Sequence, residues 1–341
     1  RPAPESPELS NSDAPLGLDS AFNWCDLGGC TPVKDQGYCG SCWAFSTVGP
    51  LESNILLQDG ETKDLSEQYL VSCNMDGWDC GGGWFAHDYH EDTKLPAEPE
   101  AGAVYEDDFP YVAPPVPSCS SPYPHHEKII SWAYVGNWWS VPSDASIKQA
   151  IYDYGPVSAA VCAGLSWGGY DSESGVFDTD ETQWCIVNFG QSVNHAIVLV
   201  GWDDNQGTNG VWILRNSWGP GWGEDGYMLI EYGISNVGYA ANYIVYSPAC
   251  HDLSTSANPG EGGSVVTEPS PNCGGDGYEP GTEVQLTASA NSGWHFTGWG
   301  GDASGASSPI TDTMDSDKSI AAHFMCDGCT PSGYVPLGMK E

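Results

Sequence analysis

QGYCGSCWAFS, residues 36–46, is the stretch that decides the fold of this chain. Its two cysteines, Cys39 and Cys42, stand three residues apart, which is the spacing of a redox dithiol or of half a zinc site. No second Cys or His pair follows at zinc spacing, and no βαβ pattern surrounds the motif. Apolar residues recur at helical spacing from Cys42 to Leu57, so Cys42 is predicted to open a helix.

Thirteen cysteines in a chain rich in glycine and proline predict a disulfide framework formed in an oxidising compartment. Because thirteen is odd, at least one thiol must stay unpaired. The predicted helix start suits Cys42 to the role of a nucleophile, since the dipole and free N–H groups at a helix N-terminus stabilise a thiolate.

Acidic residues dominate the charge: 46 Asp and Glu stand against 9 Lys and Arg, for a formal net charge of −37. Nucleic acids and anionic membranes would repel such a surface, so neither is expected as a partner. The longest apolar runs, such as AIVLV at 196–200, have the length of a strand and are too short for a membrane span. The charge indicates either a general solubilising surface or an acidic or saline habitat. An acid optimum is our expectation, because protonation of carboxylates relieves their repulsion.

Composition divides the chain into four segments. Residues 1–15 are proline-rich and acidic and are predicted to be flexible. Residues 16–248 are dense in Trp, Tyr and Gly and form the predicted main domain. Residues 251–325 are rich in Ser, Thr and Gly and contain short strand patterns, which predicts a small all-β module. Residues 326–341 show no periodicity and are expected to be a tail.

Helical patterns precede strand patterns within the main domain. Helices are predicted over residues 42–57, 66–71 and 146–154. Strands are predicted over residues 156–162, 194–202, 210–218 and 226–233. This order predicts an α+β protein with two sub-domains.

Further motifs accompany the opening stretch. They are LSEQYLVSC at 65–73, CGGGW at 80–84, NHAIVLVGW at 194–202 and NSWGPGWGEDGY at 216–227. Together with CGSCW at 39–43, a signature of papain-like cysteine peptidases, their order and wording resemble that family across residues 16–248. The resemblance implies a papain-like fold with a helical left sub-domain and a β-barrel-like right sub-domain.

The resemblance assigns the catalytic positions. Cys42 would be the nucleophile, His195 its base, and Asn216 the group that orients the imidazole. The side-chain amide of Gln36 and the backbone N–H of Cys42 would form the oxyanion hole. Trp218 would shield the hydrogen bond between Asn216 and His195 from water and would also contact the substrate. His195 and Asn216 follow Cys42 by slightly more than the usual interval of about 130–150 residues, so a loop insertion is expected near residues 178–189.

The same resemblance implies a substrate groove. Gly82 and Gly83, in a glycine run that by itself also fits a simple turn, would let backbone groups pair with an extended substrate. Asn194, directly before His195, would contact the substrate. The S2 and S3 pockets would be lined by Trp84, Phe85, Ala160 and Val193, with the floor of S2 at Ile244 or Val245. All these lining residues are apolar, which predicts a preference for an apolar or aromatic P2 residue.

Disulfide pairing is partly implied by the resemblance. Cys39 would pair with Cys80 and Cys73 with Cys119, leaving Cys42 free. Cys25–Cys30 and Cys162–Cys185 are further expected pairs, whereas Cys250, Cys273, Cys326 and Cys329 allow three connectivities. The CDGC motif at 326–329 favours a tight disulfide over a metal site.

Proline and histidine positions give separate predictions. Pro50 falls inside the first predicted helix, where it removes a hydrogen bond, so we expect a kink and another partner for the carbonyl of Ser46. His87 and His90 stand among carboxylates and are predicted to lie at the surface. The pair at 125–126 is interpreted as a solvated entrance to a strand.

The C-terminal module carries GWHFTGW at 293–299. It resembles the divergent B-repeat modules of bacterial secreted and surface proteins. Trp294 and Trp299 are expected to pack its core, with ligand binding as the alternative.

Together these features predict a secreted, bacterial cysteine endopeptidase that cleaves polypeptides through an acyl-enzyme intermediate, without a metal or another cofactor. A monomer is expected. Its inhibitory propeptide would precede residue 1 and be removed on maturation. The alternative is a catalytically idle peptidase fold that presents the β module to a surface or polysaccharide as a binding or adhesion protein.

Overall fold

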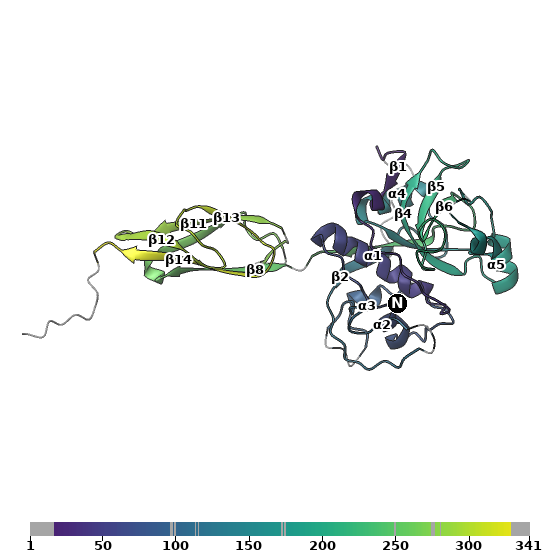
Figure 1. Ribbon diagram of the computed structural model, residues 1–341, viewed down its shortest axis with the longest axis horizontal. Coiled ribbons are helices and arrows are strands. Elements are labelled where there is room, and N and C mark those ends of the chain that lie inside the picture. Colours follow the sequence, from purple (N-terminus) through teal and green to yellow (C-terminus); the bar gives the residue numbers. More distant parts are fainter. Residues whose placement is uncertain are drawn as a thin grey trace, which may run out of the picture. The chain divides into compact units, whose positions relative to one another are not determined.

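The computed structural model describes residues 17–328, apart from residues 96, 97, 99, 113, 115, 172, 174, 249, 274–276 and 280. The predictions for residues 1–15 and for nearly all of the tail therefore lie outside the described residues. The chain divides into two compact units after Ser247 (Figure 1). In the part of the chain that the structure describes, no helix combines the length and the apolar character needed to cross a membrane.

The first unit packs helices against one antiparallel sheet. The strand order is β2-β7-β3-β4-β5-β6, and β1 pairs with β4 outside this path. The strands are β1 (Ala21–Asn23), β2 (Ile129–Tyr134), β3 (Val157–Val161), β4 (His195–Asp203), β5 (Val211–Arg215), β6 (Tyr227–Glu231) and β7 (Tyr239–Tyr246). The helices are α1 (Cys42–Asp59), α2 (Glu67–Cys73), α3 (Asp88–Glu91), α4 (Asp144–Tyr154) and α5 (Thr182–Phe189). This is the α+β arrangement that the sequence predicts.

Local sequence explains where the predicted helices begin and end. The Ser66 hydroxyl accepts a hydrogen bond from the Tyr69 N–H at the start of α2, and Ser143 caps α4 in the same way. Gly155 follows the last residue of α4. Helix α5, which ends at Gly190 with a φ of 70°, occupies the region where only a loop insertion was expected. Its apolar residues from Trp184 to Val187 form a continuous run without helical spacing, so the sequence pattern did not predict a helix.

Helix α1 lies between the sheet and the smaller helices (Figure 1). Every residue from Trp43 to Ile55 is buried. Pro50 lies inside the helix, and the carbonyl of Ser46, which loses its helical partner there, accepts a hydrogen bond from the Ser158 hydroxyl on β3. The expected replacement partner is therefore confirmed, while the kink stays a prediction.

The first unit has two apolar cores. One gathers residues of α1, α2 and the segment around α3 with β2 and β7. The other lies among α4 and the strands of the sheet and contains Trp167, Trp202 and Trp212, each fully buried. Burial of a large apolar side chain contributes about 1.5–3 kcal/mol, so both cores stabilise the unit.

The second unit is built from two β-sheets. One has the order β10-β8-β14-β12 and the other β13-β11-β9. The strands are β8 (His251–Asn258), β9 (Gly263–Glu268), β10 (Gly277–Tyr278), β11 (Glu283–Ala290), β12 (Trp294–Gly301), β13 (Ile310–Thr313) and β14 (Lys318–Cys326). Trp299 is buried in the core, and its indole N–H donates to the Ser307 carbonyl at 2.8 Å. Trp294 packs against the same core, so both tryptophans take the structural role expected of them.

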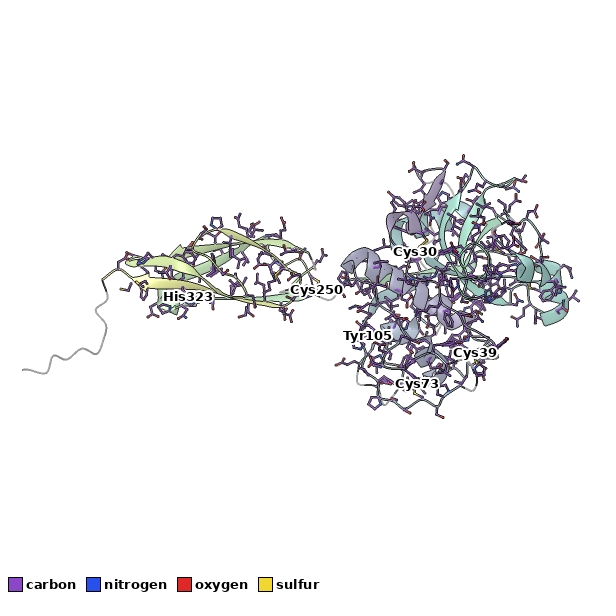
Figure 2. The ribbon with its side chains drawn as sticks, viewed as in Figure 1. Cys30, Cys39, Cys73, Tyr105, Cys250 and His323 are labelled. Carbon is purple, nitrogen blue, oxygen red and sulfur yellow. A yellow bond between two sulfur atoms is a disulfide. The ribbon has the colours of Figure 1, made fainter. Side chains whose placement is uncertain are left out.

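Five disulfides cross-link the described residues, and several of their cysteines are labelled in Figure 2. They are Cys25–Cys30, Cys39–Cys80, Cys73–Cys119, Cys162–Cys185 and Cys250–Cys273. The first four are the expected pairs, and the fifth selects one of the three open connectivities. Cys329 lies outside the described residues. Among those described, Cys42 is the one free cysteine.

The surface prediction for two histidines is wrong. His87 and His90 are 0% and 1% exposed. They stand three residues apart, so the turn of α3 directs both into the helical core, and His87 Nε2 lies 2.8 Å from Asn242 Oδ1. His125 is also buried, with Nδ1 2.6 Å from the Gly102 carbonyl, whereas His126 is partly exposed. Of the two histidines predicted to form a solvated entrance to a strand, only His126 is exposed to solvent.

Burial of these imidazoles predicts an acid limit to stability. Burial lowers the pKa of His87 to about 4, although its bond to Asn242 opposes the shift. Burial, followed by repulsion from neighbouring imidazoles, lowers the pKa of His90 to about 3. Both groups take up protons more readily when unfolded, where the pKa is about 6.5. We therefore expect full stability above about pH 6.5 and a loss of up to about 1.4 kcal/mol per pH unit for each histidine as the pH falls.

Calorimetric scans of the full chain from pH 8 to pH 4, in which the unfolding transition of the first unit is followed, test this expectation. The His90→Leu variant should show a shallower loss of melting temperature, because it lacks one titrating group. The His251→Gln variant, altered in the second unit, serves as the control. A melting temperature of the wild type that stays constant down to pH 4 would contradict the prediction. This loss of stability at low pH opposes the acid optimum of activity that the net charge leads us to expect.

Candidate active site

The ends of three elements meet at one cleft. Cys42 is the first residue of α1, and His195 is the first residue of β4. Both line a cleft of about 650 Å³. Asn216 follows β5, which pairs with β4, and its Oδ1 lies 2.7 Å from His195 Nε2. The structure therefore brings together three residues that are far apart in the sequence.

Asn216 fixes the orientation of the imidazole. Its Oδ1 can only accept, so His195 Nε2 carries the proton of this bond. The same oxygen accepts from the Ser217 N–H at 2.8 Å, which holds the amide in place. With Nε2 protonated, Nδ1 is the ring atom that can take up a proton from a nucleophile.

Aromatic rings enclose this hydrogen bond. The Trp218 ring lies 5.0 Å from that of His195, and the Trp167 ring lies 5.8 Å away in an edge-to-face arrangement. Trp222 stacks on Trp167 and donates from its indole N–H to the Trp167 carbonyl at 3.0 Å. The sequence identified Trp218 but not Trp167, which comes from a short 3-10 helix (Leu165–Gly169) without a motif of its own.

Burial affects both partners of the expected nucleophile–base pair. It raises the pKa of the Cys42 thiol, while hydrogen bonds from backbone N–H groups, including that of Ala196, act in the opposite direction. It lowers the pKa of His195 to about 4, opposed by the bond to Asn216. Burial alone thus favours a neutral thiol and a neutral imidazole. The helix N-terminus and the backbone N–H groups are the features that favour the thiolate.

Gln36 is held beside Cys42 by its own amide. Its Nε2 donates to the Cys39 carbonyl at 2.8 Å, and its Oε1 accepts from the Ser217 hydroxyl at 2.6 Å. The backbone N–H of Gln36 also donates to the Ser217 carbonyl at 2.8 Å. One hydrogen of the Nε2 group is not used by these bonds and can be donated into the cleft that Gln36 lines.

Tyr111 is a further residue near the site that the sequence did not indicate. Its hydroxyl donates to the Gln36 carbonyl at 2.9 Å and lies 2.6 Å from the Ser41 Oγ, which donates to it. Ser41 precedes Cys42 and makes no side-chain cap bond to α1. Tyr111 therefore joins the two segments that carry Gln36 and Cys42.

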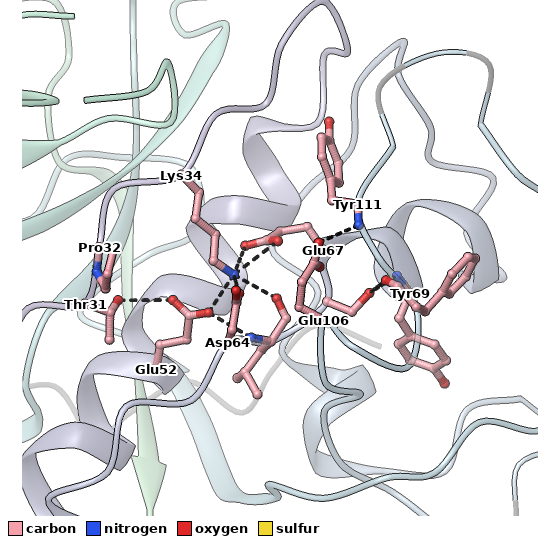
Figure 3. A network of polar contacts seen from close by, with 12 residues as sticks. Thr31, Pro32, Lys34, Glu52, Asp64, Glu67, Tyr69, Glu106 and Tyr111 are labelled. Atoms are coloured by element: carbon pink, nitrogen blue, oxygen red, sulfur yellow. Dashed lines mark hydrogen bonds and ion pairs between the residues drawn. The ribbon is translucent and has the colours of Figure 1, made fainter. Parts of the chain in front are cut away.

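A buried charge cluster anchors the segment that leads to Gln36 (Figure 3). Lys34 Nζ lies 2.6 Å from Glu52 Oε1, 2.6 Å from Asp64 Oδ1 and 3.1 Å from Glu67 Oε1. Glu52 belongs to α1 and Glu67 to α2, and each is 1% exposed. One lysine thus ties the approach to Gln36 to both helices.

The cluster holds more negative than positive charge. Burial alone would lower the pKa of Lys34, but Glu67 and Glu52 outweigh it and raise that pKa. Burial raises the pKa of Glu67, and Lys34 offsets only part of the shift. The ammonium therefore stays charged, and one carboxyl is readily protonated. A buried charge without its partners would be strongly destabilising.

Apart from Ile244 and Val245, the residues predicted to contact substrate line the same cleft. They are Gly82, Gly83, Trp84, Phe85, Ala160, Val193, Asn194 and Trp218. Trp78, Ala163, Phe189 and Gln191 also line it and were not predicted. Phe189 is the last residue of α5. Because this helix was not predicted from the sequence, the contribution of Phe189 to the cleft was not predicted either.

Packing explains two of the glycines. A Cβ on Gly83 would approach the Trp43 ring to 2.6 Å, and Gly82 has a φ of +128°, which L side chains rarely adopt. Asp79 and Gly82 exchange backbone hydrogen bonds. The run is thus a tight turn, and it also lines the cleft, so the two interpretations of these glycines are compatible.

The residues expected at the floor of the S2 pocket do not line the cleft. Ile244 is 1% exposed and packs in the helical core, opposite Trp132 on β2. Neither Ile244 nor Val245 is among the residues found to line the cleft. On β7 the residue paired with Ala160 is Tyr239, which lines the adjoining cavity. A register shift between β3 and β7 separates it from the expected positions.

Comparison with known proteins agrees with this geometry. Residues 18–247 match the family described as papain family cysteine protease. The chain belongs to the papain family. Residues 253–327 match the divergent InlB B-repeat domain, which accounts for the second unit.

Two relatives illustrate the similarity. Falcipain-2a of Plasmodium falciparum (isolate 3D7) is 33% identical over 221 residues, which cover 62% of this chain and 41% of falcipain-2a. Cathepsin K of Gallus gallus is 34% identical over 234 residues, covering 68% of this chain and 63% of that protein. The chain thus spans less than two thirds of the length of these relatives.

A solved structure shares the fold. The digestive procathepsin L2 proteinase from the larval midgut of Tenebrio molitor superposes with a TM-score of 0.56 at 29% identity. The superposition covers 68% of this chain and 70% of that chain. The papain-like, two-sub-domain fold that the sequence predicts is therefore confirmed.

The Tyr111 contacts generate a prediction for this papain-family site. Tyr111→Phe should lower kcat about two- to tenfold with little change in KM, because it removes hydrogen bonds that hold Gln36 and Ser41 but touches no substrate pocket. Tyr38→Phe is the matched control, since Tyr38 is fully exposed on the segment that carries Gln36 and Ser41. Steady-state kinetics on a fluorogenic peptide measures both. Equal kcat values for the two variants would show that Tyr111 does not position the site.

Proposed function

We propose that this chain is a cysteine endopeptidase in which Cys42 is the nucleophile. The observation that carries the proposal is the convergence of Cys42, His195 and Gln36 at one cleft, with the buried Asn216 bound to the imidazole at 2.7 Å. Membership of the papain family supports the reaction class. The roles of the four residues follow from their chemistry.

Proton transfer from the Cys42 thiol to His195 Nδ1 starts the reaction. The thiolate attacks the scissile carbonyl carbon, and its oxygen takes the negative charge. The backbone N–H of Cys42 and the Gln36 amide donate to that oxyanion. The imidazolium gives its proton to the leaving amine, which departs and leaves a thioester. Water, deprotonated by His195, then attacks the thioester carbonyl, and the product acid and the free thiol are released.

An extended peptide fits the cleft. Gly82 and Gly83 line the cleft, and because the Gly82 N–H and carbonyl are used in the turn with Asp79, the strand-like pairing with a substrate is assigned to the backbone of Gly83. Trp84, Phe85 and Val193 present apolar surface beside them. An apolar or aromatic residue at P2 is therefore part of the proposal.

Cellular context belongs to the same proposal. Five disulfides are stable in an oxidising compartment, which supports secretion. A propeptide that blocks the cleft before maturation is proposed because a structural relative is a procathepsin. We propose a monomer that acts on polypeptides without a cofactor, with 16–248 as the peptidase domain and 251–325 as a separate β module.

Replacing the nucleophile tests the proposal directly. Cys42→Ala should lower kcat/KM by more than about a thousandfold, because the thioester cannot form. Wild type should consume one equivalent of an epoxysuccinyl thiol inhibitor, and the variant none. An unreactive wild-type thiol in a folded protein would favour the idle, binding-protein alternative. Comparable hydrolysis by the variant would point to another nucleophile.

Removal of the second unit provides a further test. A chain ending at Ser247 should keep the kcat and KM of the full chain on short peptides, because every proposed catalytic residue lies in the first compact unit. Circular dichroism verifies folding, and the same truncation carrying Cys42→Ala is the blank. A folded but inactive truncation would mean that the β module is needed to complete the site.

A further inference from the structure

A second cavity of about 600 Å³ adjoins the cleft. The two share the walls formed by Trp78, Trp84, Phe85, Gln191 and Val193. These residues lie on the side of the proposed S2 and S3 pockets. We call this second cavity the annex.

Aromatic rings form most of the annex. Its lining includes Trp78, Trp84, Tyr89, Trp132, Tyr134, Trp138 and Tyr239. Trp138 is 48% exposed, and the next residue, Trp139, packs edge-to-face against it. Exposed aromatic surface beside a cavity is typical of a binding site.

The annex also contains two carboxylates, in different states. Asp88 accepts from the Trp132 indole N–H at 2.7 Å and binds Lys94 Nζ at 2.8 Å, so its charge is already compensated. Asp76 is exposed and accepts a hydrogen bond at 2.7 Å from the Tyr89 hydroxyl, which is neutral. None of the described residues found to line the annex is basic. Asp76 therefore stands beside aromatic faces with an uncompensated charge.

We propose that the annex binds a cationic side chain of the peptide substrate, a lysine or arginine on the acyl side of the scissile bond. This proposal rests on the proposed peptidase function. It adds a preference for a cationic side chain to the expected preference for an apolar P2 residue. Asp76 and Trp138 are the specificity-determining residues.

Two forces select a cation over a neutral side chain. An aromatic face attracts an ammonium or guanidinium group, most strongly when the ring is an indole. The Asp76 carboxylate adds an ion pair at the open side of the cavity, which salt weakens because the group is exposed. A long aliphatic stem also suits an aromatic wall, so lysine and arginine gain contacts along their whole length.

Fluorogenic peptides with a fixed apolar P2 residue provide the test. Arginine, lysine, norleucine or glutamate is placed in turn at P3 and at P4, and kcat/KM is measured at about 0.05 M and 1 M NaCl. A P2 series with the same four residues completes the set. We expect arginine and lysine to exceed norleucine about tenfold at one of these positions at low salt, with a smaller ratio at high salt.

Variants locate the effect in the annex. Asp76→Asn keeps an acceptor for Tyr89 but removes the charge, and should lower the arginine-to-norleucine ratio about threefold. Trp138→Ala should lower it similarly. Asp107→Asn is the matched control, because it removes one exposed charge outside the annex. Melting temperatures verify that each variant is folded.

The outcomes separate this inference from the proposed function. Cleavage of the norleucine peptides with no preference for a cation at any position would overturn the annex assignment and leave the peptidase intact. A cation preference that survives in both Asp76→Asn and Trp138→Ala would also overturn it. Absence of cleavage of every peptide, together with an inert Cys42, would overturn the proposed function itself.

Discussion

Burial of α1 from Trp43 to Ile55 is the constraint on which the first unit depends. A buried helix normally carries apolar residues all round, yet this stretch contains buried Ser46, Thr47, Glu52 and Asn54. Each polar group must find a partner in a neighbouring element, because an unpaired buried group costs about 1–3 kcal/mol. The surrounding structure is arranged to provide those partners.

The partners come from both sides of the helix. The Ser46 hydroxyl donates to the Ile197 carbonyl on β4 at 2.6 Å, and Asn54 Nδ2 donates to the Tyr154 carbonyl at 3.0 Å. On the other side, the Thr47 hydroxyl accepts from the Ala86 N–H at 3.0 Å. These bonds fix the position of α1 against β4. Since Cys42 and His195 are the first residues of these two elements, the same bonds determine how the catalytic candidates face each other.

Sequence motifs predicted the site well where each residue sits in a short, characteristic segment. Cys42, His195 and Asn216 are of this kind, since each stands at the start or end of an element. Tertiary pairing decided the rest. Ile244 lies in the helical core while Tyr239 pairs with Ala160 next to a register shift, and His87 is buried although its neighbours are acidic. No local pattern reveals such events.

The disulfides close only short stretches of chain, with separations of 5 to 46 residues, and none of those described joins the helical half of the first unit to its sheet half. The two walls of the cleft are therefore connected by non-covalent contacts and by the uncross-linked backbone. Air oxidation of a stored sample would attack the one free thiol described, at Cys42. A mild reductant restores this thiol and can also open a loop disulfide. It does not affect the non-covalent contacts that align the two walls of the cleft.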